Sequence, residues 1–258
     1  MIPVTAILCV KNEIKNLPHS LPLLQKYFNE VIVVDSNSVD GTADFFSTHQ
    51  FTWNKQYPKK RQWILDNITT KHDWVFMVDA DEIVTDEFIA GLQSSDFLAD
   101  GYFISSRMVW NNKILKFGQK NNKLCLFKKS KFIFPAIDDL DIQGMNEMEG
   151  HYQPVAKTSA TIEQIKSPII HHDHKGDWGT RHDNYINWEI AMNHRNAWPT
   201  DPMPWRQFLK SKIRKSYVRP ILIFTYGYIF KCGFLDGRAG FDYAFNRARY
   251  AWKIVRAS

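Results

Sequence analysis

Two stretches of sequence decide the fold. The first is Glu30-Val-Ile-Val-Val-Asp35, and the second is Trp74-Val-Phe-Met-Val78, which Asp79 follows directly. Each is a short apolar run followed at once by turn-forming residues, which is typical of strands buried on both faces of a parallel sheet. In an open parallel sheet, ligands bind outside the carboxyl ends of the strands. Asp35 and Asp79 are therefore expected at one ligand-binding edge.

The sequence around these strands alternates between strand-like and helix-like patterns. Val4–Val10 has the composition of a first strand, and Leu17–Phe28 has apolar residues at helical spacing with Asn16 as a possible cap. The further expected elements are a helix from Thr42, a short strand near Phe51–Tyr57, a helix over Lys59–Thr70, longer strands over Tyr102–Asn111 and Lys123–Ser130, and a helix over Trp178–Trp198. This order predicts an α/β fold with a mostly parallel central sheet, helices on both faces and a C-terminal helical tail.

Charge is distributed unevenly along the chain. Residues 206–258 contain 12 Lys and Arg against 2 acidic residues, whereas the rest of the chain contains 21 Lys and Arg against 25 acidic residues. A basic segment of this kind favours an anionic partner. We therefore expect a catalytic domain over residues 1–200 and a basic, amphipathic helical tail over residues 201–258.

The start of the chain does not resemble an export signal. The apolar run Val4–Val10 is followed at once by Lys11-Asn-Glu13, which makes it too short to be a signal sequence or a membrane span. The cysteines Cys9, Cys125 and Cys232 are widely separated, as is typical of reduced thiols. These features predict a cytoplasmic protein.

The segment Asp79-Ala-Asp81-Glu82 has the composition of a metal site. Two carboxylates one residue apart on a bend can both reach one hard cation such as Mg²⁺ or Mn²⁺. Such a cation would stabilise the charge that develops on a diphosphate leaving group. An isolated Asp-x-Asp is more often a solvated turn, but its place directly after an apolar strand and the second acidic strand end favour the metal site.

Several motifs, in order, resemble the inverting family 2 glycosyltransferases of the GT-A fold. They are Cys9-Val-Lys-Asn-Glu13, Val33-Val-Asp-Ser-Asn-Ser-Val-Asp-Gly-Thr42, Lys60-Arg-Gln-Trp-Ile-Leu65 and the Asp-x-Asp segment Val78-Asp-Ala-Asp-Glu82. Gly233-Phe-Leu-Asp-Gly-Arg-Ala-Gly-Phe241 is similar to the tail of a subgroup that adds glucose to the inner core of lipopolysaccharide. The likeness is strong before residue 90 and patchy between residues 100 and 170.

The resemblance implies a set of residues that hold the nucleotide sugar. They are Val10, Glu13, Asp35, Ser36, Arg61, Asp79 and Ala80. Asp35 is expected to accept a hydrogen bond from the uracil ring N–H, which lies between two carbonyls and so suits a carboxylate. Arg61 matches a basic position that reaches the donor diphosphate. Without the family, Ser36–Thr42 would be an ordinary turn and Arg61 a surface side chain.

The resemblance also implies the metal ligands. Asp81 matches the main ligand, and His171 in Ile169-Ile-His-His-Asp-His174 matches a downstream histidine ligand. A zinc site is an alternative for this cluster, but its spacing differs from familiar zinc motifs. Solvated loop histidines are the other alternative.

The catalytic base is sought in the middle region of the chain. The subgroup has a His-Glu pair in the middle region, and here Asn146 stands in place of the histidine in the segment from Gly144 to His151. Glu147 is the first choice for the base and Glu149 the second. Asp138 and Asp139 remain alternatives.

The implied reaction is inverting transfer of a sugar, for example a hexose such as glucose, from a UDP-sugar to an acceptor hydroxyl. The implied acceptor is a cell-surface glycan or a lipopolysaccharide core precursor. A haloacid-dehalogenase-like phosphatase is one alternative, because Asp79-x-Asp81-x-Ile83 approaches that family's nucleophile motif. A catalytically idle protein that binds nucleotide sugars is another, and the Asn146 departure is the feature that favours it.

The tail predicts attachment to an anionic membrane surface. Pro220–Phe230 is apolar for eleven residues, which is too short to span a bilayer. Its basic and aromatic neighbours suit a helix in the membrane interface; they are Arg214, Lys215, Tyr217, Arg219, Tyr226, Tyr228 and Lys231. The alternative is a tail that packs on the catalytic domain. No nucleic-acid-binding motif accompanies the charge, and nothing in the sequence indicates an oligomeric state.

Overall fold

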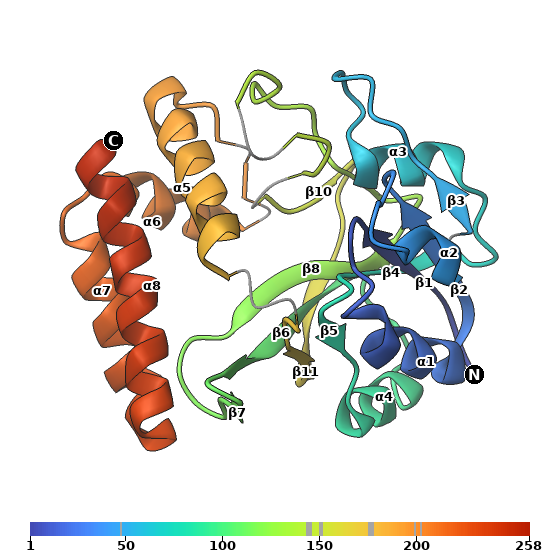
Figure 1. Ribbon diagram of the computed structural model, residues 1–258, viewed down its shortest axis with the longest axis horizontal. Coiled ribbons are helices and arrows are strands. Elements are labelled where there is room, and N and C mark those ends of the chain that lie inside the picture. Colours follow the sequence, from blue (N-terminus) through green and yellow to red (C-terminus); the bar gives the residue numbers. More distant parts are fainter. Residues whose placement is uncertain (47, 143–145, 150–151, 175–177, 199, 202) are drawn as a thin grey trace. The chain divides into compact units, whose positions relative to one another are not determined.

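The computed structural model describes residues 1–46, 48–142, 146–149, 152–174, 178–198, 200–201 and 203–258 (Figure 1). The chain forms two compact units that alternate along the sequence. The first contains residues 1–106, 122–134 and 154–176, and the second contains residues 107–121, 135–153 and 177–258. The division into a catalytic domain to residue 200 and a tail from residue 201 stays a prediction.

A mixed, mostly parallel sheet forms the centre of the fold. Its strands are β1 (Ile2–Val10), β2 (Phe28–Asp35), β3 (His49–Gln50), β4 (Trp74–Val78), β5 (Glu82–Ile83), β6 (Gly101–Trp110), β7 (Lys113–Ile114), β8 (Asn121–Lys128) and β11 (Ile162–His171). The order is β3-β2-β1-β4-β8-β6-β11-β5, and β7 pairs with β6. The strands β9 (Phe132–Ile133) and β10 (Val155–Ala156) form a separate antiparallel pair.

The parallel part of the sheet brings the ends of β1, β2 and β4 to one edge. Val10 pairs with Asp35 across β1 and β2, and Leu8 pairs with Val78 across β1 and β4. The second half of each strand is largely apolar and buried; Asp35 is the last residue of β2, and Asp79 directly follows β4. The edge that the sequence predicts is therefore present.

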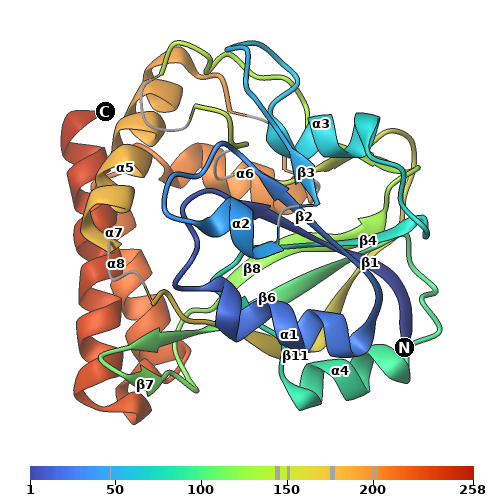
Figure 2. The same cartoon turned by 45° about the vertical axis from the view of Figure 1, so that its right-hand side comes forward.

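The helices of the first unit are α1 (Leu17–Tyr27), α2 (Thr42–Phe46), α3 (Lys60–Asn67) and α4 (Asp86–Gln93). Figures 1 and 2 show α3 on one side of the parallel strands and α1 and α4 on the other. Asn16 occupies the cap position of α1, but its side chain makes no cap hydrogen bond. Its amide donates to Glu13 Oε2 at 2.7 Å and its oxygen accepts from the backbone N of His174 at 2.8 Å.

The expected strand near Phe51–Tyr57 is wrong. The strand next to β2 is β3, and the last ladder contact is the hydrogen bond from Phe51 N to Asp35 O at 2.8 Å. Beyond Phe51 the chain turns on the Asn54 side chain, which accepts from Gln56 N at 3.0 Å. A side chain that bonds its own backbone in this way competes with a strand ladder.

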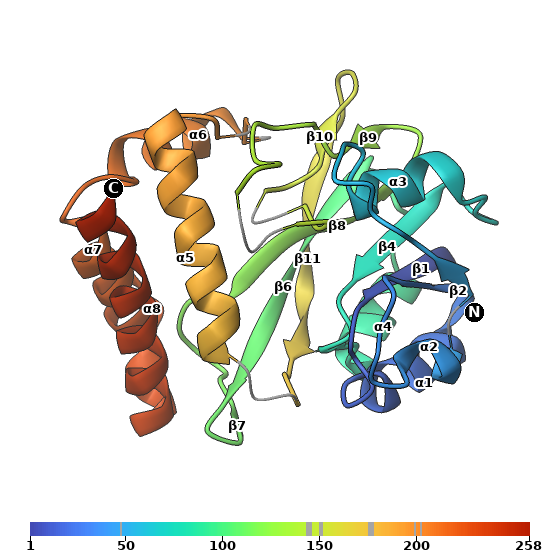
Figure 3. The ribbon, with the colours of Figure 1, turned by 45° about the horizontal axis from the view of Figure 1, so that its top comes forward.

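Helices dominate the second unit. They are α5 (Trp178–Arg195), α6 (Pro204–Ile213), α7 (Arg219–Thr225), the π-helical turn η1 (Tyr226–Phe230), the 3₁₀ turn η2 (Gly233–Asp236) and α8 (Arg238–Ala257). Figure 3 shows α7 running beside α8, and α5 also contacts α8. Among the residues that the structure describes, no helix combines the length and the apolar character needed to cross a bilayer.

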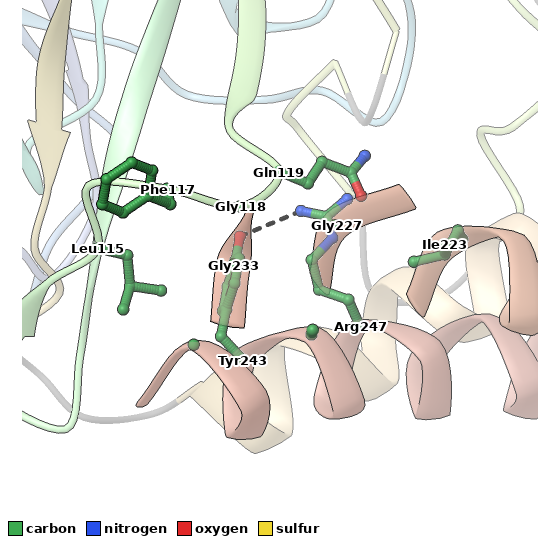
Figure 4. A pocket seen from close by; sticks show the side chains of 11 residues that line it. Leu115, Phe117, Gly118, Gln119, Ile223, Gly227, Gly233, Tyr243 and Arg247 are labelled. Carbon is green, nitrogen blue, oxygen red and sulfur yellow. Dashed lines mark hydrogen bonds between the residues drawn. The ribbon is translucent and has the colours of Figure 1, made fainter. Parts of the chain in front are cut away.

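Glycines let the backbone segments of the second unit approach closely (Figure 4). A Cβ atom on Gly233 would lie 2.7 Å from the carbonyl oxygen of Gly227, so only glycine fits there. The cavity between these segments has a volume of about 10 Å³, and Leu115, Tyr243 and Arg247 line part of it. This volume holds at most about one water molecule, so the feature is a packing contact rather than a ligand site.

Candidate active site

The site begins where β1 and β2 end. Asp35 is fully buried, and its carboxylate accepts hydrogen bonds from Ser38 N, at 3.0 Å, and from the Ser38 hydroxyl. Ser36 follows, and its backbone N donates to Val10 O at 3.1 Å. The Asp35 side chain thus closes the Asp-Ser turn, and a backbone hydrogen bond joins the turn to the end of β1.

The turn over residues 36–42 also fixes the segment after β1. Thr42 Oγ1 accepts from Glu13 N at 2.7 Å, and Ser38 Oγ accepts from Asn12 N at 2.8 Å. Asp40 accepts from Thr42 N at 3.0 Å, which closes the turn. The motif residues therefore shape the backbone at this edge. This gives a physical reason for the repeated Ser, Asp and Thr side chains.

The start of α3 presents cations to the same edge. Lys60 is almost fully buried, and its ammonium donates to Val10 O at 2.7 Å. Arg61 makes an ion pair with Asp79 at 3.1 Å, and its guanidinium lies 5.9 Å from the centre of the Phe134 ring. The sequence singled out Arg61 but missed Lys60. Lys60 could have been found in the sequence as the basic residue directly before Arg61, in a helix whose other buried residues are apolar.

Lys123 is the main feature that the sequence did not reveal. It lies on β8, and its ammonium is 2.7 Å from Asp79 Oδ2 and 2.6 Å from Glu82 Oε1. Asp79 therefore has one oxygen on Lys123 and the other on Arg61. The backbone N of Asp79 donates to Glu82 Oε2 at 3.0 Å, which completes a closed cluster.

The charges of this cluster shift the ionisation of its members. Burial disfavours the charged form of Asp79, but Lys123 and Arg61 outweigh it and hold the pKa of Asp79 well below its usual range. Burial likewise opposes the Lys123 ammonium, while Asp79 and Glu82 raise the pKa of Lys123 above its usual value. The cluster is thus fully charged at neutral pH, with Asp79 engaged by two cations.

Asp81 points to a different partner, His171. Pairing of β5 with β11 sets Glu82 opposite His171, and His172 N donates to Asp81 O at 2.8 Å. This places His171 Nε2 3.5 Å from Asp81 Oδ2. Burial, together with the nearby Asp79 and Glu82 charges, raises the pKa of Asp81 despite His171. The pKa of His171 is also raised, because Asp81 and Glu82 outweigh its burial.

These two side chains are the pair in the site that fits a divalent cation. Oxygen and nitrogen ligands in neighbouring positions around such an ion lie about 3 Å apart, close to the separation of Asp81 Oδ2 and His171 Nε2. Within the described part of the chain, no group of three or more His, Cys, Asp or Glu side chains is arranged to hold a metal. The described residues therefore offer two neighbouring side chains, and no complete ligand set, for such an ion.

The residues considered for the base lie in the second unit. Glu147 and Glu149 are both buried, with exposed fractions of 9% and 2%. Asp139 is also buried and accepts from Trp188 Nε1 at 3.0 Å, whereas the Asp138 side chain is 75% exposed. The neighbouring motif residues 144, 145, 150 and 151 lie outside the described residues. The base stays a prediction.

Comparison with known families decides the assignment. The profile of glycosyl transferase family 2 matches residues 5–152, which include the turn, the Asp-x-Asp segment and Lys123. The chain belongs to glycosyl transferase family 2. Among curated proteins, none matches this chain. The family 2 assignment agrees with the mixed, mostly parallel sheet of a GT-A fold.

Solved structures similar to this family 2 chain have low sequence identity to it. The structure of S. aureus TarS is 14% identical with a TM-score of 0.47; the match covers 96% of this chain and 49% of TarS, so the chain spans about half the length of that relative. TarS 1–349 in complex with UDP is also 14% identical, with a TM-score of 0.47 and coverage of 99% and 88%. Glucosyl-3-phosphoglycerate synthase from Mycobacterium tuberculosis, with Mg²⁺ and UDP, is 14% identical with a TM-score of 0.36 and coverage of 77% and 81%.

The family assignment bears on the phosphatase alternative. In that reading Asp79 would attack a phosphorus atom, but both of its oxygens are in ion pairs with Arg61 and Lys123. The Asp-Ser turn would also have no role. The phosphatase reading is therefore set aside in favour of the family 2 assignment.

Proposed function

We propose that this protein is an inverting, metal-assisted transferase that uses a UDP-sugar. The observation that carries the proposal is that Asp79 and Asp81, although one residue apart, contact different partners. Asp79 is engaged by Arg61 and Lys123, whereas Asp81 lies 3.5 Å from a histidine nitrogen and carries a raised pKa. A family 2 enzyme needs both a nucleotide-sugar pocket and a group that stabilises the leaving diphosphate.

The donor is proposed to lie along the edge formed by the ends of β1, β2 and β4. Asp35 and Ser36, with Val10 and Glu13, would hold the base and ribose. Asp79 and Ala80 would lie next to the ribose, and Arg61 would approach the diphosphate. This arrangement is supported by the short connections among these segments, including the bond from Ser36 N to Val10 O.

Asp81 and His171 are the residues proposed to hold Mg²⁺ or Mn²⁺. A bound cation would stabilise the negative charge on the departing diphosphate. The protein's own part is to fix the two ligands: the β5–β11 pairing sets their separation, and the Lys123 cluster fixes the backbone on either side of Asp81. Diphosphate oxygens and water would supply the remaining ligands.

In the proposed single displacement, the acceptor oxygen bonds to the anomeric carbon while the bond to the diphosphate breaks. A carboxylate takes the proton of the acceptor hydroxyl. Glu147 is the proposed base and Glu149 the second choice; their burial supports a role as groups shielded from bulk water. The transferred sugar is proposed to be a hexose such as glucose.

Thermal unfolding with nucleotides and metal tests the donor and metal site. UDP, ADP, GDP and CDP are added separately, each with and without Mn²⁺. UDP with Mn²⁺ is expected to raise Tm more than either alone, because a ligand stabilises the native state by mass action. Asp81→Asn and His171→Ala are expected to lose the Mn²⁺-dependent part of the rise.

Asp44→Asn is the matched control, because Asp44 is an exposed carboxylate on α2 outside the site. It is expected to behave as the wild type. An equal rise with and without Mn²⁺, or a full Mn²⁺ effect in Asp81→Asn, would contradict the metal site. Metal-dependent release of UDP from a UDP-sugar without acceptor distinguishes an active enzyme from an idle nucleotide-sugar-binding protein.

The acceptor is proposed to be a glycan or lipid-linked molecule, such as a lipopolysaccharide core precursor, on the cytoplasmic side of a membrane. Two features of the chain support this proposal. They are the similarity of Gly233–Phe241 to the tail of the glucosyltransferase subgroup, and the excess of basic residues after residue 206. An anionic membrane surface would then be a partner of the protein.

A further inference from the structure

The outer face of α8 combines aromatic and arginine side chains in one line. The residues are Arg238, Phe241, Phe245, Arg249, Trp252 and Arg256, all of them exposed. Their spacing of three or four residues places them on a single face of the helix. We call this set the aromatic–arginine stripe. The opposite face of α8 is buried through Tyr243, Ala244, Ala251 and Ile254.

Ring contacts join the stripe to α7 and η1. Phe241 lies 5.9 Å from Phe224 and 5.6 Å from Tyr228, measured between ring centres. Trp252 lies 6.1 Å from Tyr217. Figure 3 shows α7 and α8 side by side along this length. The apolar surface therefore continues from α8 onto its neighbour, where Ile221 is 65% and Phe230 is 73% exposed.

Basic side chains outnumber acidic ones in this part of the chain. After residue 203 the chain has only Asp236 and Asp242 as acidic residues. Asp236 is buried and accepts from the backbone N of Lys116 and Phe117, and Asp242 lies 3.9 Å from Arg238. Neither aspartate pairs with Arg249 or Arg256; Asp183 on α5 lines the same surface hollow as Arg249 and pairs with Lys253 at 2.9 Å.

This differs from the basic residues that the sequence singled out. Arg219 makes a 2.9 Å ion pair with Glu189, and Arg214 stacks on the Trp198 ring at 3.7 Å. Burial lowers the pKa of Arg214 to about 10. Both arginines thus stabilise the second unit internally. Lys215 and Lys231 are exposed, and further exposed charge comes from α8, whose amphipathic pattern lies outside the apolar run Pro220–Phe230.

We propose that the aromatic–arginine stripe and the exposed residues of α7 and η1 dock on an anionic lipid bilayer. An amphipathic helix with aromatic residues and arginines on its exposed face lies in the membrane interface, where rings enter the apolar boundary and guanidinium groups contact anionic headgroups. The inference deepens the proposed function by naming the surface that brings the enzyme to a lipid-linked acceptor. Docking itself requires no donor and no metal.

Two other occupants fit the surface less well. A second copy of the chain docked symmetrically would place arginines of the same stripe against each other, which like-charge repulsion disfavours. A nucleic acid would use the arginines through its phosphates, but duplex binding gives no reason for exposed rings along the whole helix. A bilayer uses both components of the stripe.

Flotation with vesicles of stated composition tests the docking. Full-length protein is mixed with neutral phosphatidylcholine vesicles, or with vesicles that also contain phosphatidylglycerol, at low and high salt. Binding is expected to the anionic vesicles alone, and to weaken as salt rises because charges at a membrane surface are screened. The absence of binding to anionic vesicles at low salt would overturn the proposal.

Variants separate the two components of the stripe. Phe245→Ser with Trp252→Ser is expected to weaken vesicle binding by about tenfold or more, because each ring contributes apolar area to the interface. Arg238→Gln, Arg249→Gln and Arg256→Gln together are expected to weaken it by about a hundredfold, at roughly fivefold for each arginine. Unchanged binding in either variant would overturn the proposal.

Control variants in the first unit remove the same number of exposed apolar and basic side chains. Phe45→Ser with Leu98→Ser removes exposed apolar side chains, and Lys15→Gln, Lys55→Gln and Lys157→Gln remove exposed charges. These variants are expected to bind vesicles as the wild type does. Thermal unfolding with UDP and Mn²⁺ on every variant reports the proposed donor site separately, so a failure of docking and a failure of the transferase proposal are distinguishable.

A fluorescent label gives a second measurement that does not depend on losing binding. Phe245→Cys, in a background with Cys9→Ser and Cys232→Ser, is labelled with an environment-sensitive dye, and its emission is expected to shift to the blue with anionic vesicles. The same label at Leu98→Cys is expected not to shift. Concentration-dependent self-association without vesicles, abolished by Phe245→Ser with Trp252→Ser, would assign the surface to a second copy instead. Salt-sensitive binding to duplex DNA that needs the arginines but not the rings would assign it to nucleic acid.

Discussion

At the scale of single residues, Lys123 explains how three neighbouring carboxylates coexist. Asp79, Asp81 and Glu82 lie within four positions of the chain, and isolated buried carboxylates would repel one another. Lys123 bridges Asp79 and Glu82, which leaves Asp81 as the carboxylate with a raised pKa. The difference between the two aspartates of the Asp-x-Asp segment therefore follows from the two cations that pair with Asp79, Lys123 on β8 and Arg61 on α3.

Replacing Lys123 tests this account. Lys123→Met removes the cation and leaves Asp79 and Glu82 close together, so the free energy of unfolding is expected to fall by about 2–4 kcal/mol. The Mn²⁺-dependent rise in Tm with UDP is expected to be lost as well. Urea denaturation measures the first effect and thermal unfolding with ligand the second.

Lys128→Met is the matched control, because Lys128 lies on the same strand and pairs with one carboxylate, that of Asp100. Its removal leaves no pair of neighbouring carboxylates and no fully buried one without a cation, so this variant is expected to lose much less than Lys123→Met. Adding Glu82→Gln to Lys123→Met is expected to restore part of the stability by removing one carboxylate. Equal losses in the two lysine variants would contradict the account.

At the scale of elements, the start of α8 depends on a glycine. A Cβ atom on Gly240 would overlap the carbonyl oxygen of Gly233 in η2 and would lie 2.9 Å from the Cβ of Asp236. Neither neighbour can give way, because one is backbone and the other belongs to a side chain that holds Lys116 N and Phe117 N. Gly240→Ala is therefore expected to lower the free energy of unfolding by about 3 kcal/mol.

Gly91 provides the opposite case in another helix. It lies inside α4, and a Cβ atom there would meet the Ser167 hydroxyl at 3.3 Å, a group that can rotate away. Alanine is favoured over glycine inside a helix, so Gly91→Ala is expected to be neutral or stabilising by about 0.5–1 kcal/mol. Chemical denaturation of both variants checks the contrast. A similar loss in both would show that packing at Gly240 is not the cause.

The elements also show what the sequence could predict. The strand Trp74–Val78 was predicted to the residue, because its apolar run is bounded on both sides by polar residues. Features that depend on pairing across long stretches of chain were not predictable in the same way. Lys123 and Asp79 are 44 positions apart, and the β5–β11 pairing that sets His171 beside Asp81 joins short segments with no local signal. His171 itself was predicted from the family resemblance alone.

At the scale of the whole molecule, each compact unit contains its own partly buried ionic cluster, and the two clusters respond to opposite ends of the pH range. In the first unit, the pKa of Asp79 is held low by Lys123 and Arg61 against its burial. In the second unit, Tyr250 donates to Glu189 at 2.7 Å, and Arg219 pairs with the same carboxylate. Burial and the Glu189 charge raise the pKa of Tyr250 above its usual value.

The signs of the two contributions follow from linkage between protonation and folding. A lowered folded pKa gives Asp79 a stabilising contribution that is present above its unfolded pKa of about 3.9 and is lost as pH falls through the folded value. A raised folded pKa gives Tyr250 a contribution that is present below its unfolded pKa of about 10 and is lost as pH rises through the folded value. Loss of the Asp79 contribution therefore lowers the free energy of unfolding in acid, and loss of the Tyr250 contribution lowers it in alkali.

Asp79→Asn tests the contribution that is lost in acid and Tyr250→Phe the contribution that is lost in alkali, so each serves as the control for the other. At pH 7 Tyr250→Phe is expected to cost about 2 kcal/mol, the contribution of a buried hydrogen bond to a charged group. The difference from the wild type should persist in acid and shrink above about pH 10, whereas that of Asp79→Asn should persist in alkali and shrink below about pH 4. Urea denaturation between pH 3 and 11, with a chelator present, measures both profiles. If the Tyr250→Phe difference instead shrank in acid, the buried hydroxyl would not be the group that limits stability in alkali, because its raised pKa can act only there.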